Sequence, residues 1–327
     1  MGRLQFLLGR LLKSAVVLLA VIVLNFTVLR LAPGDPALVL AGEQGAADAA
    51  FVDQIRKDFG LDKPVGEQLV VYIKSLATLD LGLSFRERRP IWHIISERLP
   101  ATILLTLTAF AISLVVGIPL GALAARRPNG ALDVVLTTVS TAFFAMPLFW
   151  TGLLAIILFS VWLNWLPSYG MITVGAPLGG LAAVLDVIKH LTLPAMTLAL
   201  FYISIYLRMT RAAVIDVMGS DYVRTARAIG LPAGRIWRQH IVRNALLPVV
   251  TFASLQAGHL IGGSIVIETV FAWPGIGRLA FDALMQRDYN LLLSIFFVSS
   301  AVVLIFNFIA DILYVLVDPR IEAGAAA

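Results

Sequence analysis

Long apolar runs alternate with short charged segments along almost the whole chain. Runs of this length and composition are typical of helices that cross a membrane, whose hydrocarbon core is about 30 Å thick. We interpret six of them as transmembrane spans, at residues 14–29, 101–125, 134–165, 191–207, 247–267 and 291–317. The pattern therefore predicts an all-α polytopic membrane protein with six transmembrane helices.

Two of the runs contain residues that bend helices or let them approach closely. The run 134–165 is too long for one upright helix and contains Pro147, which predicts a tilted or kinked span. Gly117, Pro119 and Gly121 lie towards the end of the run 101–125. These residues predict a bend or a close helix contact there.

The distribution of basic residues sets the expected topology. Segments assigned to the inside contain thirteen Lys and Arg residues, and the two short outer loops contain three. By the positive-inside rule, both termini are expected in the cytoplasm. The first run also fits a signal peptide, but no small-x-small cleavage site follows it at residues 30–34, so we interpret it as an uncleaved anchor.

Composition shifts from apolar to alternating acidic and basic residues between the first and second runs. The amphipathic patterns at 51–61 and 69–76 predict a folded extracytoplasmic insert, acting either as a solvated cap or as a substrate contact. The expected organisation is an N-terminal tail with the first span at 1–32, the insert at 33–98, a core of five spans with a cytoplasmic hairpin (212–246) at 99–317, and a cytoplasmic tail at 318–327.

Another polar stretch between two spans, residues 220–248, is interpreted as two short helices joined at a glycine. Ser220 is a good N-cap residue, and Asp221 suits the positive end of a helix. Gly230 is expected to end the first helix, and Pro232 to begin the second. Apolar positions at helical spacing are Tyr222, Val223, Ala226 and Ile229, then Ile236, Trp237 and Ile241 with His240. Periodicity alone also allows a merely solvated loop.

Gly230, with Arg224-Thr225-Ala226 before it and residues 240–248 after it, resembles the EAA loop of ABC importer permeases. The likeness is greatest to the oligopeptide and dipeptide permease family. Three other strings are similar to that family: DLGLSF at 80–85, AMPLFW at 145–150 and ETVFAWPGIG at 268–277. Arg224 replaces the glutamate of the general EAA pattern, and Arg243 stands where a proline is usual.

The resemblance implies a type I ABC importer permease fold in a bacterial inner membrane. It further implies a second homologous permease subunit, two ATPase subunits that bind ATP and Mg²⁺, an extracytoplasmic solute-binding protein and surrounding lipid. The expected cargo is a di- or oligopeptide, with glutathione, nickel chelates and related solutes as alternatives within the family. No cofactor is expected on this chain itself.

The hairpin supplies the candidate residues for coupling to an ATPase. These are Asp221, Tyr222, Arg224, Thr225, Ala226, Arg227 and Gly230, with Ile236 and Trp237 adding apolar surface. Candidates for the translocation pathway gather in the fifth run, where small and polar residues are densest: Gln256, Gly258, His259, Gly262 and Gly263. Helix packing is the alternative interpretation for each of these five.

Several classes of function lack their residues in this sequence. There is no HExxH, GxSxG or GxxxxGK[ST] motif, no cysteine, and only four scattered histidines, so neither an enzyme nor a metal site is predicted. The net charge of +5 comes without a basic run interleaved with aromatics, so no nucleic-acid partner is expected. A secondary transporter and a membrane scaffold remain as alternatives of a different class.

Overall fold

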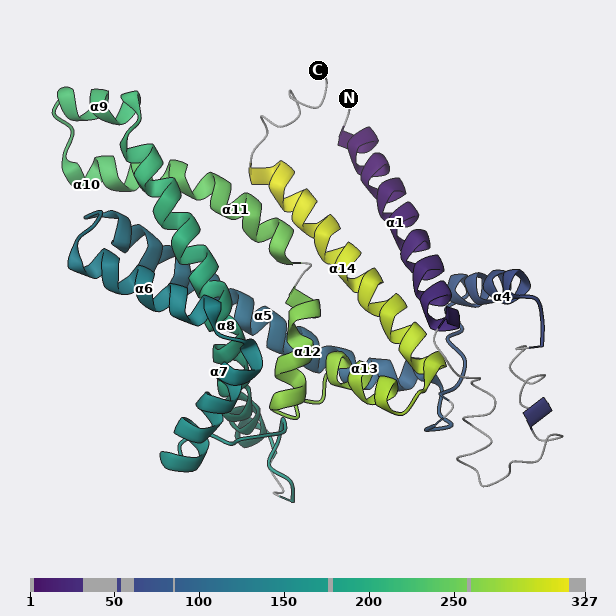
Figure 1. Cartoon of the computed structure of the whole chain (residues 1–327). Coiled ribbons are helices and arrows are strands. Elements are labelled where there is room, and N and C mark those ends of the chain that lie inside the picture. Colours follow the sequence, from purple (N-terminus) through teal and green to yellow (C-terminus); the bar gives the residue numbers. More distant parts are fainter. Residues whose placement is uncertain are drawn as a thin grey trace.

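The computed structural model describes residues 3–31, 52–53, 62–84, 86–175, 179–257 and 260–317. Helices dominate this part of the chain (Figure 1), and its only extended pairing is a single bridge between Leu83 and Pro90. The helices are α1 (Arg3–Leu31), α4 (Val65–Ala77), α5 (Ile91–Ala125), α6 (Ala131–Ala145), α7 (Leu148–Ala155), η1 (Ile156–Trp162), α8 (Leu181–Met218), α9 (Asp221–Ala228), α10 (Ala233–Arg235), η2 (Ile236–Val242), α11 (Arg243–Ala257), α12 (Leu260–Val270), α13 (Ile276–Met285) and α14 (Tyr289–Val317), of which η1 and η2 are π-helical.

Four described helices, α1, α5, α8 and α14, are long and apolar enough to cross a membrane. Helix α6 and the pair α7–η1 meet at a bend of 106°, and they make a fifth span if the bent pair counts as one. This break lies at Met146 and Pro147, where a kink was predicted, because a proline cannot continue the hydrogen bonding of α6. The fifth predicted run falls on α11 and α12 with residues 258–259 outside the described chain, so six spans stay a prediction.

Two helix boundaries differ from those expected from hydropathy. Helix α5 begins at Ile91 instead of Ala101, because Ile91, Ile94 and Ile95 are buried against α13 and α14 and stabilise an amphipathic start. Helix α8 begins at Leu181, inside the predicted outer loop 166–190, and extends over 38 residues. A window for apolar runs misses these ends because they contain charged residues, Glu97 and Arg98 in α5 and Asp186 and Lys189 in α8.

Helices α5 and α8 pack against each other so closely that only glycine fits at the contact. A Cβ atom on Gly117 would lie 2.9 Å from the Cβ of Tyr206, and one on Gly121 would lie 2.8 Å from the Cβ of Thr210. The predicted close approach at these glycines is confirmed. Leu105, Leu198 and Tyr206, all buried, fill the core between the helices.

A second core joins α1, α4, the start of α5, α13 and α14. Ser84 and the backbone N–H of Arg86 donate hydrogen bonds to Asp288, and Asn290 donates to the carbonyl of Leu83, so the segment after α4 is fixed to the start of α14. The amphipathic pattern at 69–76 corresponds to α4, whereas 51–61 lies almost wholly outside the described residues. The first turns of α1, the last turns of α14 and helix α9 lie at one end of the molecule in Figure 1.

Candidate functional site

The hairpin is built from α9, α10 and η2, and Gly230 ends its first helix as expected. Gly230 has a φ of +78°, in the left-handed region that favours glycine. Its N–H donates to the carbonyl of Arg227, and the N–H of Leu231 donates to that of Ala226. These two bonds form a Schellman motif, which satisfies carbonyls at the end of α9 and turns the chain back.

Ser220 occupies the N-cap position of α9 without capping it through its side chain, which corrects the prediction. Its backbone is extended, but its hydroxyl donates to the carbonyl of Val217 at 2.6 Å. Helix α8 ends at Met218, so the carbonyl of Val217 in its last turn lies close by and accepts this hydroxyl as well as the backbone N–H of Ser220. Asp221 in the first turn of α9 is exposed and pairs with Arg224 at 3.5 Å.

One face of the hairpin is buried against the ends of the long helices. Val223, Ala226, Ile236 and Ile241 form a core with Ala125 of α5 and Val214 of α8, and Ala245 of α11 joins them. Ala226 and Ile236, which the sequence offered as docking residues, therefore lie inside the chain. Half-buried Trp237 lies under the guanidinium of Arg126 at 5.1 Å. The hairpin is thus packed on α5 and α8 as one unit.

The opposite face of the hairpin is exposed and mostly polar. Ile229, 70% exposed, adds an aliphatic side chain to it. The hydroxyl of Tyr222 accepts a hydrogen bond from the amide of Asn244 at 3.2 Å. The exposed candidate residues are Asp221, Tyr222, Arg224, Thr225, Arg227 and Gly230. These six exposed residues lie on α9 and the turn that follows it, and we call them the hairpin surface.

The pathway candidates are described only in part. Gln256 is half-buried in the last turn of α11, and Gly262 and Gly263 belong to α12. Gly258 and His259 lie outside the described residues. Their role in translocation therefore stays a prediction.

A buried acidic side chain, that of Glu268, lies at the turn 268–277. Glu268 is 0% exposed and accepts hydrogen bonds from Thr102 at 2.7 Å, from Ser264 at 3.0 Å and from the backbone N–H of Arg278 at 3.0 Å. The indole N–H of Trp273 donates to the carbonyl of Ala101 at 2.9 Å, so this turn is fixed to α5.

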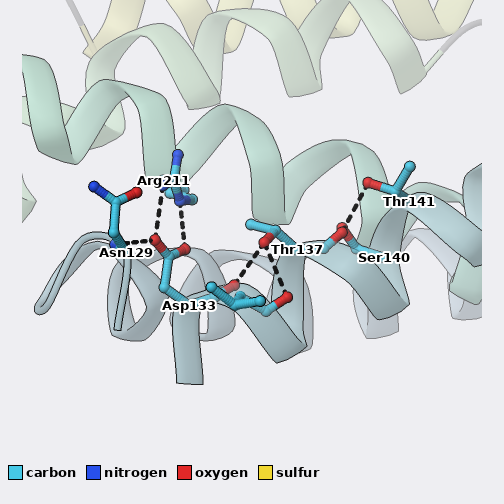
Figure 2. Close-up of polar contacts among 7 residues, drawn as sticks. Asn129, Asp133, Thr137, Ser140, Thr141 and Arg211 are labelled. Carbon is cyan, nitrogen blue, oxygen red and sulfur yellow. Dashed lines mark hydrogen bonds and ion pairs between the residues drawn. The ribbon is translucent and has the colours of Figure 1, made fainter. Parts of the chain in front are cut away.

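Sequence reasoning missed a buried ion pair between α6 and α8. Asp133 is 2% exposed and receives two hydrogen bonds from Arg211, as Figure 2 shows. Neither residue was a candidate for coupling or for translocation in the sequence. The sequence did offer one sign of this ion pair, because Asp133 is an acidic residue close to basic residues on the side assigned to the cytoplasm.

The family model described as binding-protein-dependent transport system inner membrane component matches residues 117–323, and the model for the N-terminal part of such components matches residues 3–106. The oligopeptide transport system permease protein AppB of Bacillus subtilis is 39% identical over 97% of this chain and 99% of its own length. The dipeptide transport system permease protein DppB of Escherichia coli K12 is 36% identical over 98% of this chain and 99% of its own length.

The fold also resembles that of a solved transporter. A chain of the MetNI methionine ABC transporter, in inward-facing conformations, matches with a TM-score of 0.56 at 17% identity, over 70% of this chain and 99% of that chain. At this identity the likeness concerns the fold, and it agrees with the type I importer architecture expected from the hairpin. The chain therefore belongs to the family of binding-protein-dependent transport system inner membrane components, as an ABC importer permease related to the oligopeptide and dipeptide permeases.

Proposed function

We propose that this chain forms half of the translocation pathway of an ATP-driven importer for di- or oligopeptides. Its relatives in Bacillus subtilis and Escherichia coli carry the names of oligopeptide and dipeptide permeases and align over nearly its whole length. That relationship supports a peptide cargo, and the packing of the hairpin on α5 and α8 supports the coupling role.

The proposed assembly contains a second homologous permease, two ATPase subunits and an extracytoplasmic solute-binding protein. ATP and Mg²⁺ bind to the ATPases, and this chain contributes no nucleotide site. Both termini and the hairpin surface face the cytoplasm of a bacterial cell. The positive-inside count supports this orientation, as does the shared end of α1, α14 and α9 in Figure 1.

The observation that carries the coupling proposal is the core shared by the hairpin, α5 and α8. A ligand shifts a conformational equilibrium only through different affinities for the two states. ATP favours the closed ATPase dimer, and a hairpin docked on that dimer transmits the preference because Val223 and Ile236 tie it to Ala125 and Val214. The long helices then exchange between inward-open and outward-open packings.

Affinity purification of the chain from native membrane, followed by reconstitution in liposomes, tests this proposal. We expect two ATPases and a second permease to co-purify, and a peptide-loaded binding protein to stimulate ATP hydrolysis and uptake of a labelled dipeptide or oligopeptide. Arg224→Glu reverses a charge on the hairpin surface and should weaken ATPase retention, whereas Arg287→Glu, at an exposed arginine between α13 and α14, should leave retention unchanged.

Two outcomes would contradict the proposal in different ways. If the chain purifies alone and supports uptake without an ATPase, the secondary-transporter reading replaces it. If the assembly forms and hydrolyses ATP but takes up glutathione or a nickel chelate in place of peptides, only the cargo is wrong.

A further inference from the structure

The ion pair between Asp133 and Arg211 fixes α6 to the helix that carries the hairpin. Arg211 donates from Nε to Oδ1 of Asp133 at 2.5 Å and from Nη2 to Oδ2 at 2.7 Å. Oδ2 also accepts the backbone N–H of Asn129 at 2.8 Å. Figure 2 shows the carboxylate of Asp133 between the loop before α6 and the side chain that reaches down from α8. Three segments therefore converge on one carboxylate.

This geometry is the strong form of an ion pair. The two parallel bonds match the planar guanidinium to the carboxylate, which fixes orientation as well as distance. Asp133 is 2% exposed and the side chain of Arg211 is 27% exposed, so water screens the pair only partly. Arg211 also lies one turn before Val214, which is part of the hairpin core. A displacement of the hairpin therefore reaches Arg211 directly.

Helix α6 packs on α8 and on α5, but few of its side chains are buried in these contacts. Its only buried residues are Asp133 and Ser140, whereas Leu132, Val135 and Val139 are exposed. At its far end, Phe144 stacks on Phe201 of α8 with ring centroids 5.3 Å apart, and Arg208 lies 4.1 Å above the same ring. The ion pair holds the start of α6 and the aromatic contact holds its end, both on α8.

We infer that Asp133 and Arg211 are positioning residues that make α6 move with the hairpin, so that a displacement at the hairpin surface reaches the bend at Pro147. Without the pair, the hairpin would move α8 while the start of α6 stayed behind. The inference rests on the proposed function for its direction, since the displacement comes from an ATPase. The ion pair itself does not depend on which solute is carried.

The first experiment measures coupling in the complete reconstituted complex. Asp133→Asn keeps the size of the side chain and removes its charge, and it should lower the amount of peptide imported per ATP hydrolysed by about tenfold, within the usual range of coupling between sites. ATP hydrolysis itself should persist. Asp216→Asn makes the same change at an exposed acid on α8 and should leave the ratio unchanged. A role confined to folding would lower complex yield and both activities together.

The second measurement follows the position of α6 directly. The chain has no cysteine, so spin labels can be attached to cysteines introduced at Val135 on α6 and Ala212 on α8, both exposed. In the unmodified background, the distance between the labels should be narrow and unchanged when ATP is bound. In Asp133→Asn and in Arg211→Gln, the distribution should broaden or shift with nucleotide.

These readings separate the failure of the inference from failure of the proposed function. A narrow, unchanged distance together with a normal import ratio in Asp133→Asn overturns the inference. If the complex proves to carry another solute, the amount of that solute imported per ATP hydrolysed is measured instead. The distance between the spin labels then still tests whether α6 stays fixed to α8. If no ATPase binds the chain, an unchanged distance distribution in Asp133→Asn of the purified chain equally overturns the inferred positioning role.

Discussion

Gly121 allows the closest approach of α5 and α8, so replacing it with alanine should be costly. The added methyl would lie 2.8 Å from the Cβ of Thr210 and 3.1 Å from the carbonyl carbon of Leu207. Carbon atoms in contact prefer about 3.5–4.0 Å, so the helices must separate by roughly 1 Å. The backbone of Leu207 cannot rotate away, which favours the upper part of the usual overpacking cost, about 3 kcal/mol. Alanine regains about 1 kcal/mol of helix propensity. The expected net loss is about 2 kcal/mol.

Equilibrium unfolding of the purified chain in lipid, followed by tryptophan fluorescence, measures this loss. Gly117→Ala should show a smaller loss, because its methyl would lie 2.9 Å from the Cβ of Tyr206 and 3.1 Å from the carbonyl oxygen of Ile203, both longer than the contact of a Gly121 methyl with the carbonyl oxygen of Leu207. Gly9→Ala is the matched control, because nothing lies within 4 Å of a methyl there. Equal stability of Gly121→Ala and Gly9→Ala would refute the close packing. A loss of the same size at all three glycines would show that the cost is not specific to the α5–α8 contact.

Three further predictions concern the turns that hold the site. Gly230→Val places a branched side chain at a φ of +78°, which should lower the unfolding free energy by about 1–2 kcal/mol and lower the amount of peptide imported per ATP. Gly230→Asn should retain most of that import, because asparagine tolerates this backbone conformation. Equal import by the two variants would contradict this prediction. Glu268→Gln replaces an acceptor with an amide donor facing the N–H of Arg278, and should lower unfolding free energy by about 2 kcal/mol; an unchanged denaturation midpoint would contradict the network. Trp273→Phe removes the hydrogen bond to Ala101 and should cost about 1 kcal/mol in the same assay, which a midpoint equal to that of the unmodified chain would exclude.

Features that depend on local chemistry were predictable from the sequence. Pro147 lies in an apolar run too long for one upright helix, so a bend there was expected, whereas Pro119 and Pro194 lie inside the continuous helices α5 and α8. A glycine between two amphipathic patterns ends a helix, so the turn at Gly230 was expected as well. Gly121 belongs to the same class, because small residues in apolar helices favour close packing.

Features that depend on distant partners were not predictable in the same way. Asp133 and Arg211 are 78 positions apart, and Glu268 and Thr102 are 166 apart, so one sequence gives no sign that they meet. The sequence also left undecided what Ile236 packs against, because an amphipathic helix can bury its apolar side against its own chain or against a partner. Ile236 and Ile241 are buried together at a spacing of five, which fits the π-helical η2 better than an α-helix.

The length of α8 amplifies small tilts of this helix into larger displacements of the hairpin. Its 38 residues continue past the predicted edge of the bilayer at residue 207 to Met218 without a break. Those last residues make a lever arm about 16 Å long, at about 1.5 Å per residue. A tilt of about 10° at the bilayer edge then becomes a stroke of about 3 Å at the hairpin, close to half the rise of one helical turn. Small rotations among the spans are thereby converted into displacements large enough to open or close a packed protein interface.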